Sequence, residues 1–205
     1  NGHIHAVCLN RVHREQPPAE TYQKERRIYT DGSMNPRKKN ARAGYGIAEY
    51  EVQAGEEKFL AARYGRVITC PQHRMFQGAT RHTNNAGELT ALLRAIQGET
   101  GAAGQTTFMV DSTYAINTAT GRTTPSRGKG GANKALACKL RVAYRRLQQE
   151  RGDAVRIQHV KSHTGVRGNE AADKLANRGA EISEGHRFVE RGSAEPARAR
   201  DEHKD

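Results

Sequence analysis

Residues 26–35 read RRIYTDGSMN, and the interpretation of the whole sequence begins with this stretch. The segment at 27–30 contains Ile, Tyr and Thr, residue types that favour a β-strand. Asp31 and Gly32 follow directly, and an Asp before a glycine is an ordinary turn former. The same arrangement also places a carboxylate at the edge of a sheet, where ligands of α/β proteins collect. The rest of the chain decides between a turn and a site.

The pattern that follows predicts strands first and then alternating helices and strands. Segments at 43–53 and 57–68 are rich in strand formers, and the turn between them contains a glycine, which predicts a hairpin. The further predicted elements are, in order, a helix at 84–99, a strand at 106–116, a helix at 133–152, a strand at 154–163 and a short helix at 168–180. This order predicts an α/β fold: a mixed five-stranded sheet, with three antiparallel strands and then parallel ones, and helices on both faces.

Composition indicates how the chain is organised. Residues 1–25 are polar and are interpreted as an arm or linker, 26–182 as one domain, and 183–205 as a disordered charged tail. The chain carries 34 Lys and Arg against 22 Asp and Glu, a formal charge of +12. Such a balance fits a polyanionic partner, but a solvated basic surface would give the same count.

Cysteine spacing and hydropathy exclude several classes. The three cysteines are far apart and odd in number, so no disulfide framework is predicted. Cys70 and His73 have the spacing of a metal-binding pair, but no second pair completes a site. No apolar run approaches the ~20 residues that span a bilayer, so we expect no membrane partner. We expect an intracellular protein, nuclear or cytoplasmic, and a monomer.

Four acidic residues lie at the ends of predicted strands or at predicted helices. Two apolar strand segments, at 27–30 and 107–110, end in Asp31 and Asp111, and Glu88 and Asp173 lie within or just after two of the helices. Singly, each is better explained as a turn or surface residue. Together at one sheet edge they would repel one another, and protonation or divalent cations would relieve the repulsion. Oxygen ligands of this kind suit Mg²⁺ or Mn²⁺.

Four blocks of sequence, in order, give the chain its resemblance to a known family. They are YTDGS with the later AGYG, then TNNAGELTALLRAI, then VDSTYAIN, and finally VRIQHVKSHTGVRGNEAADKLANRGA. The last block is the most specific, because His163 precedes Asp173 by ten positions, with a Gly-Asn-Glu between them. Over residues 26–180 the chain resembles ribonucleases H of the type 1 class.

The resemblance implies an activity and a site. Members of the family cleave the RNA strand of RNA–DNA hybrids with two Mg²⁺ ions, which Mn²⁺ can replace, and leave 5′-phosphate and 3′-hydroxyl ends. The metal-binding role would fall on Asp31, Glu88, Asp111 and Asp173. His163 matches the mobile histidine that assists proton transfer or product release, although a structural loop residue is the alternative. His159 has no such match and is interpreted as a packed or edge residue.

Further residues are expected to contact the substrate. The Thr-Asn-Asn stretch before the helix at 84–99 resembles the part of the family that contacts RNA 2′-hydroxyls, although asparagines also cap helices well. Asn169 is likewise expected to cap its helix and to contact the substrate backbone. The absence of acids from 112–149 suggests a basic surface for the DNA strand, in place of the tryptophans that many members use and this chain lacks. The expected substrate-binding residues are Gly32, Ser33, Thr83, Asn84, Asn85, Arg127, Lys129, Asn133, Lys134 and Asn169.

Three functions remain open from the sequence. The first is a hybrid-specific endoribonuclease, either free-standing or part of a retroelement polyprotein. The second is a catalytically weak nucleic-acid-binding module of the same fold within a reverse-transcriptase polyprotein, although such modules usually lose an acid. The third is another nuclease or a strand-transfer enzyme, which the block around His163 disfavours.

Overall fold

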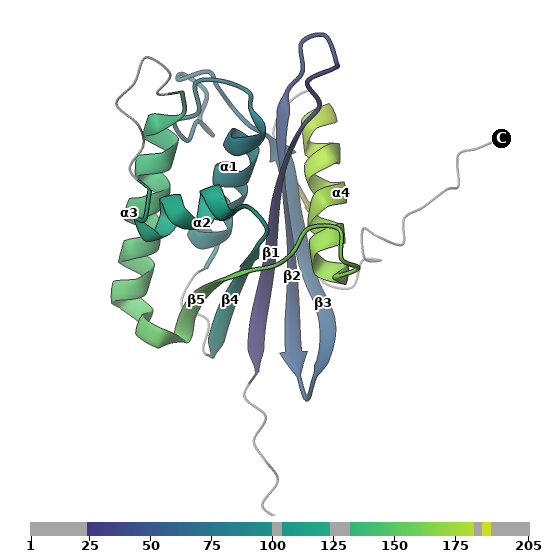
Figure 1. Cartoon of the computed structure of the whole chain (residues 1–205), viewed down its shortest axis with the longest axis vertical. Coiled ribbons are helices and arrows are strands. Elements are labelled where there is room, and N and C mark those ends of the chain that lie inside the picture. Colours follow the sequence, from purple (N-terminus) through teal and green to yellow (C-terminus); the bar gives the residue numbers. More distant parts are fainter. Residues whose placement is uncertain (1–23, 100–103, 124–131, 183–185, 190–205) are drawn as a thin grey trace, which may run out of the picture.

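The computed structural model describes residues 24–99, 104–123, 132–182 and 186–189, and in these it forms a six-stranded sheet with helices on both faces (Figure 1). The strand order is β5-β4-β1-β2-β3-β6. The strands are β1 (Glu25–Met34), β2 (Ala43–Gln53), β3 (Glu56–Arg66), β4 (Gln105–Val110), β5 (Val155–His159) and β6 (His186–Val189). The helices are α1 (Asn84–Gln97), α2 (Thr113–Thr120), α3 (Lys134–Arg151), α4 (Arg167–Glu181) and the 3₁₀ turn η1 (Gly152–Ala154).

Strand β1 lies in the middle of the sheet and sets its topology. It pairs antiparallel with β2 and parallel with β4, and β5 extends the parallel side. The β2–β3 hairpin turns through Ala54 and Gly55, whose φ angles of 52° and 81° lie in the left-handed region. These pairings confirm the predicted mixed sheet and its order of antiparallel and then parallel strands.

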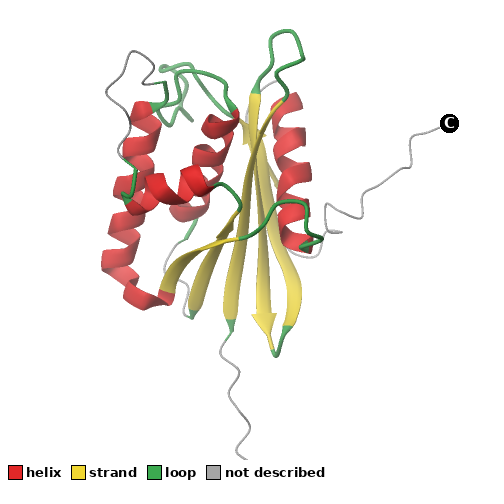
Figure 2. Cartoon of the chain, in the orientation of Figure 1, coloured by secondary structure: helices red, strands yellow, loops and turns green. Residues whose placement is uncertain are grey.

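Each face of the sheet has its own core. Helices α1 and α3 cover one face together with α2, while α4 covers part of the other, as the secondary-structure colouring shows (Figure 2). Alternate residues of β1 point to opposite faces, so Ile28 packs with Leu89 and Phe108 under α1, and Tyr29 packs with Leu175 under α4. The alternation of side chains along β1 therefore determines which residues α1 and α4 pack against.

Strand β1 and helix α1 approach each other unusually closely. A Cβ on Gly32 would lie 2.0 Å from the backbone nitrogen of Glu88 and 2.3 Å from the carbonyl carbon of Gly87. Gly32 was expected to leave room in a turn, but β1 continues to Met34 and no turn occurs there. The glycine instead allows α1 to rest on the strand at the level of Asp31.

Three sequence predictions need correction. Asp31 lies inside β1 rather than at its end. The strand predicted at 106–116 stops at Val110, and Ser112 then caps α2 by accepting a hydrogen bond from the Ala115 amide at 3.2 Å. A short sixth strand, β6, pairs with β3 inside the segment that was predicted to be a disordered tail. The predicted arm at 1–25 lies almost entirely outside the described residues.

Among the described helices, none combines the length and the apolar character that crossing a bilayer requires.

Replacing Gly32 by Ala should destabilise the protein by about 3 kcal/mol, the upper part of the usual range for overpacking, because backbone atoms of α1 must move. Chemical denaturation measures this loss. Gly55→Asn is the control, since nothing lies within 4 Å of a Cβ there and Asn tolerates a positive φ. Equal stability losses in the two variants would contradict the close approach.

Candidate metal centre

The sheet register brings two carboxylates together. Thr30 of β1 is aligned with Val110, the last residue of β4, so Asp31 and Asp111 emerge beside each other. Strand β1 continues past this point while β4 ends at Val110, so Asp31 lies within a strand and Asp111 lies just beyond the end of one. A single-residue shift of register would turn Asp31 to the opposite face of the sheet.

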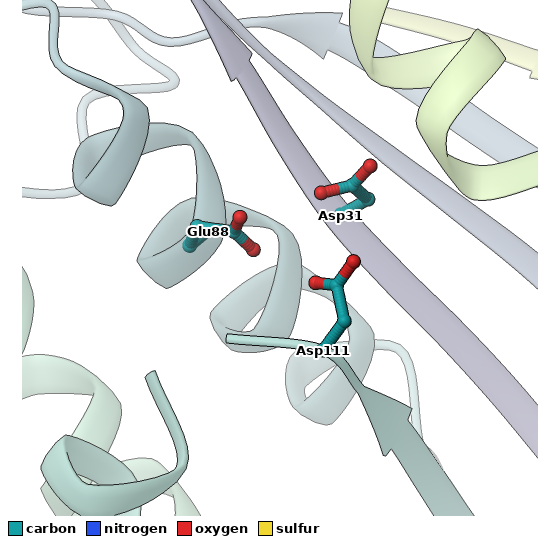
Figure 3. A group of neighbouring side chains, drawn as sticks. All are labelled: Asp31, Glu88 and Asp111. Carbon is teal, nitrogen blue, oxygen red and sulfur yellow. The ribbon is translucent and has the colours of Figure 1, made fainter. Parts of the chain in front are cut away.

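Helix α1 adds a third carboxylate to this pair. Glu88 lies in the second turn of α1, on the side that rests against Gly32. One ligand oxygen each from Asp31, Glu88 and Asp111 lie within 4.8 Å of one another, and the three side chains face a common space (Figure 3). They line a cavity of about 290 Å³.

Asp173 completes the predicted set from α4 but stands apart from the other three. It lines the same cavity, yet it does not belong to the close group of oxygens. The Asn177 side-chain amide donates a hydrogen bond to its Oδ1 at 3.2 Å, and the Ser33 hydroxyl donates to Asn177 Oδ1 at 2.5 Å. All four predicted carboxylates therefore share one cavity, with three gathered on one side of it.

Asp111 is held in place by two neighbours that fix one of its oxygens. Ser162 Oγ donates to Asp111 Oδ2 at 3.0 Å, and Asn169 Nδ2 donates to the same oxygen at 3.3 Å. Asn169 therefore does not cap its helix: the N-cap position of α4 is Val166, without a side-chain cap. Ser162 was not predicted as a site residue, and its place next to His163 in the loop was the only signal.

Burial and mutual repulsion make these carboxyl groups unusual acids. The pKa of Asp31 is raised, first by burial and then by the charges of Asp111 and Asp173. The pKa of Glu88 is raised by burial and by the charges of Asp31 and Asp111. Ionisation of these groups therefore opposes folding. The loss of stability begins as the pH rises above the ordinary carboxyl pKa of about 4, and it is complete above the raised pKa values.

The donor set fits a hard divalent cation. All the gathered ligand atoms are carboxylate oxygens, which Mg²⁺ and Mn²⁺ prefer. Glu88 Oε2 is buried and lacks a hydrogen-bond partner among the described residues, an arrangement that costs free energy unless a cation or water meets it. Asp31, Glu88 and Asp111 would hold a cation directly, with Asp173 across the cavity.

The predicted substrate-binding residues fall into three groups. Gly32, Ser33, Asn84, Asn85 and Asn169 line the cavity with the acids, as does His163. Thr83 is the actual cap of α1, since its side chain accepts from the Ala86 amide at 3.0 Å, and the asparagines that follow are exposed in the first turn. Arg127 and Lys129 lie outside the described residues.

Asn133 and Lys134 begin α3 away from the acids. Asn133 is 4% exposed, and its Oδ1 accepts from the amides of Thr80 and Arg81 at 2.8 and 3.1 Å. Its Nδ2 donates to Thr83 Oγ1 at 3.3 Å, so Asn133 ties α3 to the start of α1. Lys134 is exposed at the first position of the helix.

The two histidines of this end of the sheet differ in position. His163 is exposed in the loop before α4, with a φ of 53°, and faces the cavity. His159 is the last residue of the edge strand β5, as expected, and its Nε2 lies 3.2 Å from the Asp111 carbonyl oxygen. His163 is thus the histidine able to reach a substrate in the cavity.

Comparison with known proteins gives consistent matches. A family model described as RNase H matches residues 23–181. A curated protein named ribonuclease H, from Saccharopolyspora erythraea, is 32% identical over 160 residues, which is 74% of this chain and 88% of the relative. LC9-RNase H1, a type 1 RNase H with the type 2 active-site motif, has a TM-score of 0.57 at 20% identity, covering 83% of this chain and 79% of that one.

A viral structure carries the same fold within a longer chain. The native protease–reverse transcriptase of prototype foamy virus has a TM-score of 0.58 at 21% identity. The match covers 82% of this chain but only 22% of the viral chain. At this identity the similarity shows the fold alone.

Glu88→Gln should stabilise the metal-free protein at about pH 8, because on folding the parent must either protonate Glu88 or hold its charge beside Asp31 and Asp111, and the amide avoids both costs. Each kcal/mol gained corresponds to about 2–4 °C in melting temperature for a chain of this size. The gain should shrink towards about pH 4.5, where the parent carboxyls are protonated. Thermal melts in EDTA measure it, with the exposed Asp153→Asn as control. A gain that does not change with pH would contradict the repulsion.

Proposed function

The chain belongs to the RNase H family, and we propose that it cleaves the RNA strand of RNA–DNA hybrids with two Mg²⁺ ions, leaving 5′-phosphate and 3′-hydroxyl ends. Ribonucleases H are hydrolases, and membership rests on the family match over residues 23–181 and on the curated relative. The observation that carries the metal-dependent mechanism is the gathering of Asp31, Glu88 and Asp111 oxygens within 4.8 Å.

The residues of the cavity have distinct tasks in this proposal. Divalent cations bound there would activate the attacking water and stabilise the leaving 3′ oxygen. Ser162 and Asn169 hold Asp111 through Oδ2, so Oδ1 would be the oxygen offered to a cation. His163, exposed on a loop beside the acids, can exchange a proton with the leaving group or with solvent.

Selectivity for RNA is assigned to the start of α1. Asn84 and Asn85 are exposed in its first turn and line the cavity beside Glu88. Because Thr83 caps the helix, the asparagine side chains remain available for 2′-hydroxyl groups, which are what distinguishes RNA from DNA.

The DNA strand is assigned to the basic face of α3. Lys134, Lys139 and Arg145 are exposed on this helix. The face is smaller than the sequence indicated, because Arg141 donates to the Thr118 carbonyl at the end of α2 and Arg146 pairs with Glu150 at 2.8 Å. Phosphates are the groups that such a surface binds.

The relatives support a nucleic-acid substrate. Foamy virus protease–reverse transcriptase, solved in complex with an RNA/DNA hybrid, has a TM-score of 0.50 at 18% identity, over 87% of this chain and 22% of that one. We keep a retroelement polyprotein and a free-standing enzyme as the two settings of the activity, and the catalytically weak binding module as the alternative function.

Asp111→Asn should lower hybrid cleavage by orders of magnitude while hybrid binding persists, because the amide keeps the size of the side chain but loses its charge. Gel assays of labelled hybrid in Mg²⁺ and in EDTA, with filter binding alongside, measure both properties. Asp153→Asn, an exposed acid distant from the cavity, serves as the control. Near-parental cleavage by the Asp111 variant would refute the metal assignment.

Hybrid RNA should be cut and duplex DNA spared. Each 2′-hydroxyl contact contributes roughly 0.5–1.5 kcal/mol net, so several together give a large discrimination. Cleavage rates for hybrids with 2′-deoxy sugars placed singly around the cut site measure each contact, and Asn85→Ala should reduce the discrimination. Efficient cutting of a fully deoxy duplex would refute the assignment of RNA selectivity to this cavity.

A further inference from the structure

A second cavity, of about 420 Å³, lies next to the acidic one between the β1–β2 loop and the end of α4. Its lining includes Lys38, Lys39 and Arg42 from the loop, with the amide side chains of Asn35, Asn40 and Asn177. Among the described residues that line the cavity, Glu181 is the only acid. Three cations and one anion leave a net charge of +2, opposite in sign to the neighbouring cavity.

The two cavities are joined through side chains. Ser33 lines both of them. Its hydroxyl donates to Asn177 in the basic cavity, and Asn177 in turn donates to Asp173 in the acidic cavity. A strand that places one phosphate at the acids and continues over Ser33 therefore enters the basic cavity.

The basic residues could serve only to stabilise the end of α4. Cations near a helix C-terminus are favourable, and Lys38 pairs with Glu181 at 3.1 Å. That role needs one cation, and the pair is solvent-exposed, with side chains 61% and 65% accessible. Lys39 and Arg42 are exposed, and neither belongs to an ion pair among the residues that the structure describes, so they remain available to a ligand.

The positive field also extends beyond the cavity. The pKa of His82 lies below its ordinary value because the ring is partly buried and because Arg66 and Arg42 lie near it. His82 Nδ1 accepts from the Ala43 amide at 3.1 Å, which fixes the ring against the base of the β1–β2 loop. Arg42 and Arg66 therefore both lie close enough to His82 for their positive charges to act on its ring.

We propose that the cavity between the β1–β2 loop and α4 binds a backbone phosphate of the cleaved strand, beyond the phosphate that is cut, through Lys39 and Arg42. Asn35 and Asn40 also line the cavity, and their side-chain amides offer additional donors. A phosphate bound there holds the cleaved strand in one position along the acidic cavity. It rests on the proposed function for the identity of the strand, but its chemistry is that of phosphate binding.

The test removes the two cations in the full chain that carries Asp111→Asn, so that the hybrid is bound but not cut. The Lys39→Ala, Arg42→Ala double variant should weaken hybrid affinity on the order of tenfold, the loss of a charge-assisted contact. The log–log dependence of affinity on salt should flatten by about 0.7–0.9, one phosphate's worth. Fluorescence anisotropy with a labelled hybrid measures both.

A charge-matched control separates the effect of Lys39 and Arg42 on binding from the effect of the protein's net charge. Lys24→Ala with Lys58→Ala also removes two cations. Lys24 directly precedes β1 and Lys58 lies near the start of β3, whereas the β1–β2 loop follows the end of β1. A double variant whose affinity and salt slope equal those of this control overturns the proposal.

Two further measurements sharpen the outcome. A methylphosphonate is a neutral replacement for a phosphate. At one linkage of the RNA strand it should weaken binding to the protein with Lys39 and Arg42 intact and have no effect on the double variant.

Glu181→Gln should tighten binding about threefold, because it frees Lys38 and removes a negative charge. A pair with a purely structural role would give the opposite effect. If no methylphosphonate linkage weakens binding to the protein with Lys39 and Arg42 intact while leaving the double variant unaffected, the assignment of a phosphate to this cavity is wrong. Failure of the parent enzyme to cut hybrid in Mg²⁺ would instead refute the proposed function.

Discussion

Carboxylates that are buried side by side repel one another, and the end of this sheet is organised around that repulsion. Asp31, Glu88 and Asp111 come from a continuing strand, a helix and the end of a neighbouring strand, and their oxygens lie within 4.8 Å. Pairing of Thr30 with Val110 sets the positions of the two aspartates, and Gly32 lets α1 bring Glu88 against them. The fold supplies the free energy that keeps these charges together, and a divalent cation would return part of it.

The fourth acid links the acidic cavity to the basic one. Asp173 approaches from α4 on the opposite side of the sheet's central strand, and Asn177 and Ser33 fix its orientation. The same two residues border the basic cavity. A change of sign over so short a distance suits a strand whose cut phosphate needs cations and whose next phosphates need Lys and Arg.

Sequence predicted the four acids and the sheet because these depend on local patterns and on ordered blocks. Asp31 was placed at a strand end because a following glycine usually signals a turn, whereas here Gly32 serves the contact with α1. Helix α2 was interpreted as strand because Thr, Tyr and Ile favour strands, but the cap at Ser112 decides for a helix. Ser162 could not be identified as a partner of Asp111, since the two meet only through tertiary structure.

Direct counting of bound Mn²⁺ tests the central claim, that the gathered carboxylates are a divalent-cation site. Equilibrium dialysis near neutral pH should show saturable binding to the parent chain, which weakens steeply as the acids are protonated. Combined replacement of Asp31 and Glu88 by their amides should abolish that binding while the protein remains folded by circular dichroism. Equal Mn²⁺ binding by the parent and the doubly substituted protein would contradict the claim.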